Sequence, residues 1–372
     1  MRKIISAFIF SFLCVTTASA QIADGYYHIR NAGTGRYLSI SDTDPANYQV
    51  SQSGSVNLGG IRTFINYDSV AVSPSCVVFI TGLPGGGYNV SGQGSSLYAM
   101  TSNRLPIDIT SNGNGTYKIS GTYNGFTKFL IDRSPSDEDG YLISTNGEMT
   151  NWTFEPINTS NEFIAVRPDV KTADGTYYGT IYAGFNFRLV SPGMAAYYIS
   201  NAGGTGFTMN KIEEDVIPAS TPVLIRCNSA NIEDNKIEPV IGGYSFDNPN
   251  WLGGVYCSLK AAKHNNLTLF DRVTMRILGL TDDGELAFIA NPDPRRLYNE
   301  QFLMANKAYL KVSPGDAEVM THGGYTPEAI STITVEENAS TGLYTLTGVR
   351  IPEGVTPKAG IYIKNGKKVI IK

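Results

Sequence analysis

The residue types that most often carry out chemistry are sparse in this chain of 372 residues. Its histidines are His28, His264 and His322, and none of them stands at the spacing of a zinc-binding motif. No Gly-x-Ser-x-Gly motif, which positions the serine of many hydrolases, occurs. The sequence therefore predicts no catalytic residue, no metal site and no cofactor, and the protein is expected not to be an enzyme.

Acidic residues cluster at three places, and each cluster fits a turn at the surface: Asp137–Gly140, Glu213–Asp215 and Asp282–Gly284. The first resembles a calcium loop only briefly, because an EF-hand would need oxygen ligands where Pro135 and Asn146 stand. A glycosidase needs two carboxylates that converge in a cleft, and spacing along the chain does not reveal convergence.

Three cysteines follow the N-terminal segment: Cys76, Cys227 and Cys257. An odd number does not make a disulfide framework, and Cys76 precedes an apolar strand as a small core residue would. Cys227 and Cys257 lie in one region, so a disulfide and two buried free thiols are both open. A hydrolase with a Cys–His pair around Cys227, Cys257 and His264 is the least favoured functional alternative.

The composition favours an exported β-protein. Charged residues make up 17% of the chain and the formal net charge is −4, while Tyr and Gly are abundant. No basic stripe is visible, so nucleic acid is not expected as a partner.

Residues 1–20 are typical of a signal peptide. A basic start at Met1–Lys3 precedes the apolar run Ile4–Val15, which is too short to span a membrane, and Ala18–Ala20 offers a cleavage site. The mature chain is expected to begin at Gln21, to contain no transmembrane helix and to be extracellular or at the outer cell surface, with the periplasm as an alternative.

The first strands that the sequence predicts lie in residues 21–158. The stretch Asp24–Ile40 reads as a strand, a glycine-rich turn and a second strand, in which Tyr27 and Ile29 alternate with His28 and an arginine. This alternation predicts that His28 faces solvent.

The same pattern recurs at Gly86–Gly92 and Gly115–Gly121, and Trp152–Ile157 closes the set. Three such units share one core when they close around a pseudo-threefold axis. We therefore predict a β-trefoil in which Tyr26, Tyr88 and Tyr117 occupy matching places. The alternative is a β-sandwich with similar hairpins.

These strand pairs resemble ricin-type and fascin-like β-trefoil modules. The resemblance rests on Gly-Tyr-Tyr-His-Ile-Arg-Asn-Ala-Gly-Thr-Gly-Arg-Tyr-Leu and on Asn-Trp-Thr-Phe at residues 151–154. It implies carbohydrate binding through an acidic residue after the second strand and an amide residue beside the closing Trp. Those amide positions here are Met149 and Thr150, so Asp132, Tyr141 and Trp152 are the residues left for one sugar site.

Residues 159–325 are predicted to form a β-sandwich, with helix limited to 297–302 and a turn near Lys260. Three phrases resemble an uncharacterised module of exported bacterial surface proteins: Tyr178–Tyr182, Val216–Ile225 and Met304–Leu310. The resemblance implies an accessory or structural role.

Residues 326–372 are predicted to be a linker and a small β-hairpin module. Asn365-Gly366 between alternating residues is a strong hairpin signal. The phrases Leu-Tyr-Thr-Leu-Thr-Gly-Val-Arg and Ala-Gly-Ile-Tyr-Ile resemble the C-terminal sorting domain of type IX secretion cargo, which implies the secretion machinery as a partner.

The sequence therefore predicts an all-β protein: an N-terminal β-trefoil, a β-sandwich and a short C-terminal β-hairpin module. Its predicted function is non-catalytic binding of a glycan or another extracellular ligand through the trefoil. The alternatives are a structural or adhesin-type envelope protein without sugar binding and, less favoured, a glycan-active hydrolase.

Overall fold

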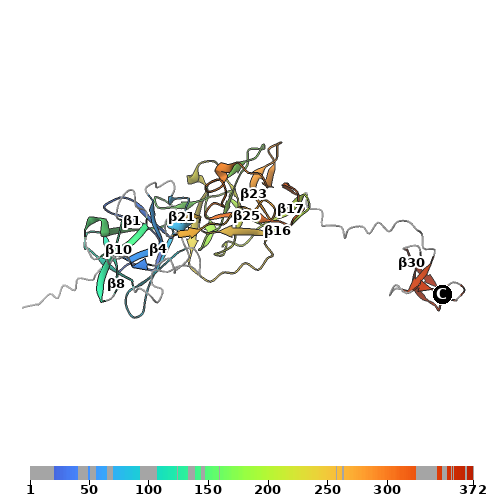
Figure 1. Cartoon of the computed structure of the whole chain (residues 1–372), viewed down its shortest axis with the longest axis horizontal. Coiled ribbons are helices and arrows are strands. Elements are labelled where there is room, and N and C mark those ends of the chain that lie inside the picture. The colour runs from blue at the N-terminus through green and yellow to red at the C-terminus, as the bar shows by residue number, and fades with distance from the viewer. Residues whose placement is uncertain are drawn as a thin grey trace, which may run out of the picture. The chain divides into compact units, whose positions relative to one another are not determined.

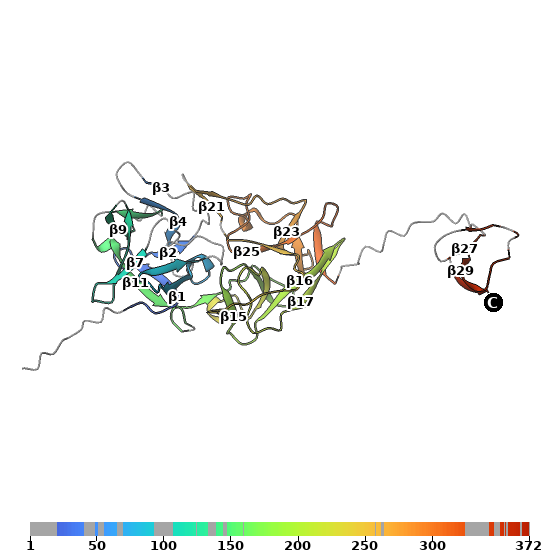
Figure 2. The ribbon, with the colours of Figure 1, turned by 90° about the horizontal axis from the view of Figure 1, so that it is seen from below.

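A computed structural model gives the architecture of the chain (Figures 1 and 2). It describes residues 21–323 and 342–371, apart from 41–48, 51–55, 65–69, 93–106, 124, 133–138, 144–146, 159, 257, 262–263, 346–349, 353, 355 and 365–366. The expected signal peptide and Cys257 therefore lie outside the described residues. The chain divides into two compact units at Tyr325/Thr326, and the class is all-β, as the sequence predicts.

Six strands of the N-terminal part pair into a closed ring, each with the next and the last with the first. Closure leaves none of the six as a free sheet edge. In ring order the strands are β1 (Gly25–Asn31), β5 (Val78–Gly82), β6 (Tyr88–Ser91), β7 (Ile107–Ser111), β8 (Tyr117–Tyr123) and β11 (Asn151–Pro156).

The other described strands of the N-terminal part pair beside this ring. In one hairpin β2 (Tyr37–Ile40) pairs with β4 (Val56–Phe64), which also pairs with β3 (Gln49–Val50). In the other, β9 (Phe126–Ile131) pairs with β10 (Asp139–Ile143). The segment after the second copy of the sequence pattern, residues 93–106, lies outside the described residues. The threefold arrangement of a trefoil therefore stays a prediction.

The ring encloses a core to which the three sequence units contribute in the same way. Tyr27 with Ile29, Tyr88 with Val90, and Tyr117 with Ile119 all pack into one apolar cluster. The prediction that Tyr26 is the counterpart of Tyr88 and Tyr117 is wrong by one residue. Because side chains alternate along a strand, Tyr27 faces the ring core and Tyr26 faces the other way.

Tyr26 joins the ring to the middle of the chain. Its ring centroid lies 4.7 Å from that of Phe79 and 5.8 Å from that of Phe185, and its hydroxyl donates to the carbonyl of Val240 at 3.5 Å. This burial raises the pKa of Tyr26 to about 12. The ring and the middle strands thus share an apolar contact within one unit.

His28 is fully buried, so the expectation that it faces solvent is wrong. Its strand is covered on the outer face as well: Tyr37 lies edge-on to the imidazole at 6.1 Å, and a Glu162 carboxylate oxygen lies 3.6 Å from Nδ1. Strand alternation predicts exposure only when one face of a strand is open, and both faces of β1 are covered.

The middle of the chain contains a curved ten-stranded sheet and a three-stranded sheet (Figure 1). In sheet order the ten strands are β13 (Val170–Lys171), β14 (Tyr177–Ile181), β18 (Val223–Cys227), β16 (Ala195–Gly203), β17 (Gly206–Lys211), β26 (Val319–His322), β24 (Leu286–Ile289), β23 (Met275–Leu280), β25 (Lys307–Lys311) and β20 (Leu252–Val255). The three are β12 (Ile164–Ala165), β19 (Lys236–Val240) and β15 (Asn186–Leu189), and β21 (Leu259–Ala261) pairs with β22 (His264–Asn266).

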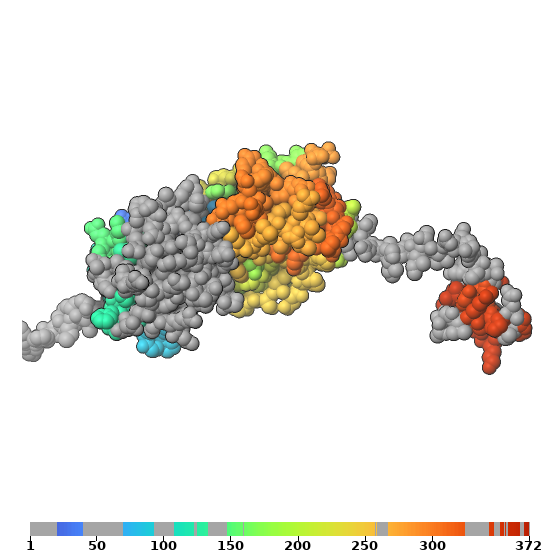
Figure 3. All heavy atoms as spheres, in the orientation of Figure 1, coloured from blue at the N-terminus to red at the C-terminus, as the bar shows by residue number. Residues whose placement is uncertain are grey.

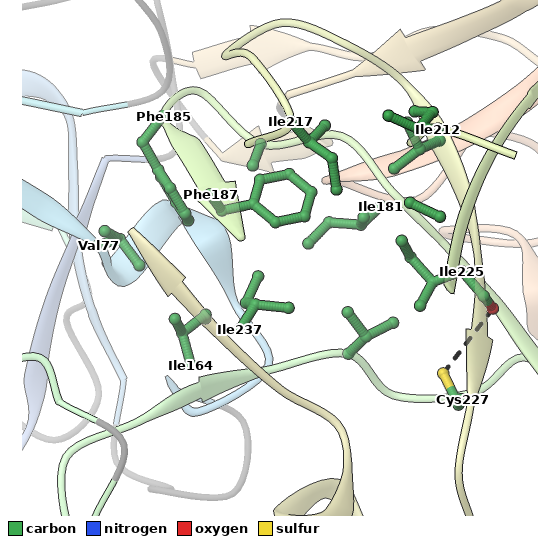
Figure 4. Packing of buried hydrophobic residues seen from close by; sticks show 14 residues of the cluster. Val77, Ile164, Ile181, Phe185, Phe187, Ile212, Ile217, Ile225, Cys227 and Ile237 are labelled. Atoms are coloured by element: carbon green, nitrogen blue, oxygen red, sulfur yellow. Dashed lines mark hydrogen bonds between the residues drawn. The ribbon is translucent and has the colours of Figure 1, made fainter. Parts of the chain in front are cut away.

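The three-stranded sheet packs on strands β14, β16 and β18 of the larger sheet (Figure 4). Phe187, Ile164 and Ile237 come from the small sheet, and Ile181 and Ile225 come from the large one. In β18, Ile225 faces this core while Leu224 faces a second core enclosed by the curved sheet. Burial on both faces explains why β18 is a nearly continuous apolar run.

The helix expected at 297–302 is absent from that described segment. A short 3-10 helix, η5, occupies Pro294–Arg296, where Pro294 fixes the first turn, and Tyr298 then pairs with Phe302 across a tight turn. Asn299 and Glu300 at the tip have positive φ, which ends any helix. Lys260, expected in a turn, lies on strand β21.

The second unit is a four-stranded antiparallel sheet in the order β28 (Arg350–Ile351), β27 (Leu343–Thr345), β29 (Gly360–Lys364) and β30 (Lys367–Ile371). The predicted pairing of residues 360–364 with 367–371 is confirmed, although the Asn365-Gly366 turn lies outside the described residues. The predicted linker, residues 326–341, also lies outside the described residues. No described helix is long and apolar enough to cross a membrane.

Candidate functional site

The residues expected to bind sugar in the N-terminal part are integrated into its interior. Asp132 is 1% exposed, and its carboxylate accepts hydrogen bonds from the Arg36 guanidinium, with Nε of Arg36 2.8 Å from Oδ2. The Thr34 hydroxyl also donates to Asp132. Buried charges are stable in proteins when they are paired in this way.

Trp152 is also 1% exposed and belongs to the ring core. Its indole Nε1 donates to the carbonyl of Leu130 at 3.1 Å, so its polar atom is satisfied internally. Tyr141 lies on β10 opposite Ile131, and its side chain is outside the described residues. The structure therefore places Asp132 and Trp152 inside the fold and brings no sugar-accessible face of either to the surface.

A cavity of about 680 Å³ opens elsewhere in the same unit, and we call it the Asp169 cavity. Its size lies within the range of about 300–1,000 Å³ that small-ligand sites occupy. Its lining comes from several segments of the chain. They are residues 72–75, 165–169 from the end of β12 onward, Thr180 and Ile181 of β14, Tyr256, Ser258, Ile277 and Leu278 of β23, Arg295 and Arg296 of η5, Tyr298, and 303–309 up to the first half of β25. Part of the surface formed by residues of the β23–β26 region is visible in orange in Figure 3.

Asp169 and Lys307 form the ionic centre of this cavity. Nζ of Lys307 lies 2.8 Å from Oδ1 of Asp169, and the backbone N–H of Thr180 donates to Oδ2 at 2.8 Å. Lys307 Nζ also donates to the carbonyl of Thr180 at 3.3 Å. These bonds join β14 to the start of β25. The two strands are not hydrogen-bonded neighbours in the sheet.

The turn before β25 is held in place by Asn306. Asn306 has a φ of 57°, its N–H donates to the carbonyl of Val255 at 2.7 Å, and its side-chain amide donates to the carbonyl of Tyr182 at 3.1 Å. Asn tolerates a left-handed conformation better than most residues do. The cavity wall from Met304 to Tyr309 is therefore fixed on both sides.

Three tyrosines give the cavity its aromatic surface: Tyr256, Tyr298 and Tyr309. Tyr256 stacks on Tyr182 with ring centroids 4.1 Å apart, and its hydroxyl lies 2.5 Å from that of Ser220. Burial, and to a lesser extent the nearby Tyr182, raises the pKa of Tyr309. All these hydroxyls can act as hydrogen-bond donors at neutral pH.

Arg296 enters the cavity from η5. Its guanidinium donates to the carbonyl of Leu278 at 2.8 Å through one Nη and to the carbonyl of Asp169 at 2.6 Å through the other. Two backbone acceptors, one on β23 and one in the segment before β13, therefore fix the plane of the group. This geometry leaves further N–H donors of Arg296 for a ligand.

Cys227 lies close to the same ion pair but is not exposed to react. It is a buried free thiol, and burial raises its pKa to about 12, with Lys307 acting in the opposite direction. A nucleophilic cysteine needs a lowered pKa and access to solvent. Cys76 is likewise free and buried, and the side chain of His264 lies outside the described residues.

Sequence reasoning did not single out the residues of this cavity as a site. A signal was nevertheless present, because two of the three phrases noted in the sequence, Tyr178–Tyr182 and Met304–Leu310, contribute residues to the cavity. Thr180 and Lys307 come from two of them, and Ser220 of the third bonds to Tyr256. The paired arginines after Pro294 were a second signal.

No model of a known protein family matches this chain, and no curated protein sequence is significantly similar to it.

Proposed function

We propose that this chain is a non-catalytic, exported or surface-associated protein that binds carbohydrate in the Asp169 cavity. The observation that carries the proposal is the combination of Tyr256, Tyr298 and Tyr309 with polar donors around one cavity of ligand size. Aromatic faces pack on the C–H faces of sugar rings, and hydroxyl, amide and guanidinium groups can donate to sugar oxygens.

The composition of the cavity favours binding over hydrolysis. Asp169 is the only carboxylate among the described residues that line it, and that carboxylate is bonded to Lys307 and Thr180. Glycoside hydrolysis by the usual route needs two carboxyl groups that flank the scissile bond. The protonated, buried thiol of Cys227 is equally unsuited to attack a substrate.

The proposed site differs from the one that the ricin-type resemblance implies. Asp132 and Trp152 have structural roles in the N-terminal part, whereas the cavity is built mainly from the middle strands. The N-terminal part then acts as a support and contributes residues 72–75, which precede β5, to the lining. The proposal keeps the ligand class expected from the sequence and changes the place where the ligand binds.

For the C-terminal unit we propose a role in export. Its four-stranded sheet is compact by itself and carries the phrases that resemble a type IX sorting domain. The test is secretion of the chain by a host with and without the type IX translocon. Equal export by both hosts would reject this part of the proposal.

A glycan array probed with the purified chain tests the carbohydrate proposal. A positive glycan is then titrated against Tyr298→Ala, with Tyr244→Ala as the matched control, because Tyr244 is 46% exposed and does not line the cavity. We expect Tyr298→Ala to weaken binding by about tenfold, since aromatic contacts contribute on the order of 1 kcal/mol or more. A chain that binds no glycan would instead support the structural or adhesin-type alternative.

A further inference from the structure

We propose that the Asp169 cavity selects acidic saccharides, in which a carboxylate or sulfate group contacts the guanidinium of Arg296. This inference rests on the proposed function and specifies its ligand class. Arg167, Arg295, Arg296 and Lys307 line the cavity, and Asp169 is the only carboxylate among the described residues that line it. The whole chain has a net charge of −4, so this positive lining is a local feature.

Two of the four cations are matched by carboxylates. Lys307 is paired with Asp169, and the exposed Arg295 is paired with Asp293, whose Oδ2 lies 2.5 Å from Nη2 of Arg295. The hydrogen bonds from Arg295 hold the pKa of Asp293 at about 2, so that pair is fully ionised at neutral pH. Neither cation therefore provides the excess positive charge.

Arg296 is held differently. The hydrogen bonds of its guanidinium with described residues go to the backbone carbonyls of Leu278 and Asp169, which orient the group and leave its charge in place. Asp293 is near enough to interact with the Arg296 guanidinium electrostatically, but the carboxylate of Asp293 accepts hydrogen bonds from Arg295. A planar guanidinium of fixed orientation is well matched to a carboxylate or sulfate group.

The neighbours of Arg296 determine the kind of anion. Tyr298 follows it by two residues, and both side chains line the cavity with Tyr309 and Ser258. A small inorganic anion would use only the cation, whereas a sugar ring also uses the aromatic faces and the hydroxyl groups. An acidic sugar residue, either a uronate or a sulfated sugar, uses both features together.

The first test compares ligands that differ only in charge. Isothermal titration of the purified chain would use hexagalacturonate and its methyl ester, with unsulfated and sulfated chondroitin hexasaccharides to separate the carboxylate from the sulfate. We expect the free acid to bind at least about tenfold more tightly than the ester, as one charged hydrogen-bonded contact allows. We also expect this difference to shrink as the salt concentration rises.

The second test uses variants whose folding is checked by thermal unfolding. Arg296→Gln should remove most of the preference for the acid and leave binding of the ester unchanged, while Arg188→Gln, on an exposed pair with Glu238 outside the cavity, should change neither. Binding of acid and ester with equal affinity would overturn this inference and leave the proposed function standing. No binding of any saccharide would overturn both.

If Arg296→Gln fails to fold, Lys307→Gln replaces it. This variant removes a positive charge and leaves the Asp169 carboxylate without its ammonium partner, so the cavity becomes less positive and acid binding should also weaken selectively. An unchanged preference for the acid in a folded variant at Arg296 or Lys307 would overturn the inference.

Discussion

The guanidinium of Arg36 and the carboxylate of Asp132 form a buried ion pair within the N-terminal part, with side-chain exposures of 2% and 1%. Nε of Arg36 lies 2.8 Å from Oδ2 of Asp132, and a second guanidinium nitrogen bonds to Oδ1. The pair joins the segment before β2 to the end of β9. An acidic residue that the sequence marks as a sugar ligand thus serves to connect two hairpins.

Removing one partner of this pair should destabilise the fold strongly. We expect Asp132→Asn to lower the free energy of unfolding by about 3–5 kcal/mol, because it leaves the Arg36 charge buried and uncompensated. Chemical denaturation measures this change, and the double variant Arg36→Met, Asp132→Leu should recover much of the loss. Saccharide binding by the folded Asp132→Asn protein should be unchanged, and selective loss of binding without loss of stability would restore Asp132 as a ligand.

Tyr26 should stabilise the contact between the ring and the middle strands. We expect Tyr26→Ala to lower the free energy of unfolding by about 2–3 kcal/mol, since it removes an aromatic ring packed against Phe79 and Phe185. The exposed Tyr244 serves as the control, and Tyr244→Ala should change stability by less than about 0.5 kcal/mol. Equal effects of the two substitutions in denaturant unfolding would show that Tyr26 does not join the two parts.

The thiols of Cys76 and Cys227 should be unreactive in the folded protein. Burial raises both pKa values from 9.0 to about 12, so both groups are neutral and shielded at pH 8. In a Cys257→Ser variant we expect a thiol reagent to label these two positions only after denaturation. Rapid labelling of either residue without denaturant would contradict the burial.

The same shift predicts how stability depends on alkaline pH. The folded-state pKa values of the two thiols lie above their unfolded-state values, so unfolding releases protons above pH 9. Their contribution to stability is therefore complete below pH 9 and is lost as the pH rises towards about 12. Replacing both cysteines with Ala should flatten this decline in denaturant midpoints, and an unchanged decline would assign it to other groups.

Gly254 should be required for the aromatic wall of the cavity. A Cβ at Gly254 would lie 2.2 Å from Cγ of Tyr182, so Gly254→Ala must displace Tyr182 and disturb its stack on Tyr256. We expect a loss of about 1–3 kcal/mol in stability from the overpacking and a weaker saccharide affinity. Gly243→Ala is the control, since a Cβ there meets no atom within 4 Å, and equal affinities of the two variants would contradict this role.

The periodic parts of the fold could be predicted from the sequence. The Tyr-x-Ile and Tyr-x-Val pairs of the three units predict strands with one buried face, and they line the ring core as expected. The position of Tyr26 and the burial of His28 could not be predicted in this way. Both depend on what covers the outer face of β1, and part of that cover comes from Phe185 and Glu162, more than a hundred residues along the chain.

The cavity could not be predicted because no local pattern encodes it. Asp169 and Lys307 are 138 positions apart and meet only when β14 lies beside the start of β25. Arg296 reads as an ordinary charged turn residue until Leu278 and Asp169 supply the carbonyls that orient it. In contrast, Asp132 and Trp152 were the residues left for a sugar site by an incomplete resemblance, and their burial depends on the rest of the N-terminal part.

A crystal structure of the chain with hexagalacturonate would show directly whether the Asp169 cavity binds acidic saccharides. We expect a sugar residue in the Asp169 cavity, with its carboxylate on the guanidinium of Arg296 and its ring against Tyr298 or Tyr309. A saccharide bound beside Asp132 and Trp152, with the Asp169 cavity unoccupied, would rule out this binding site.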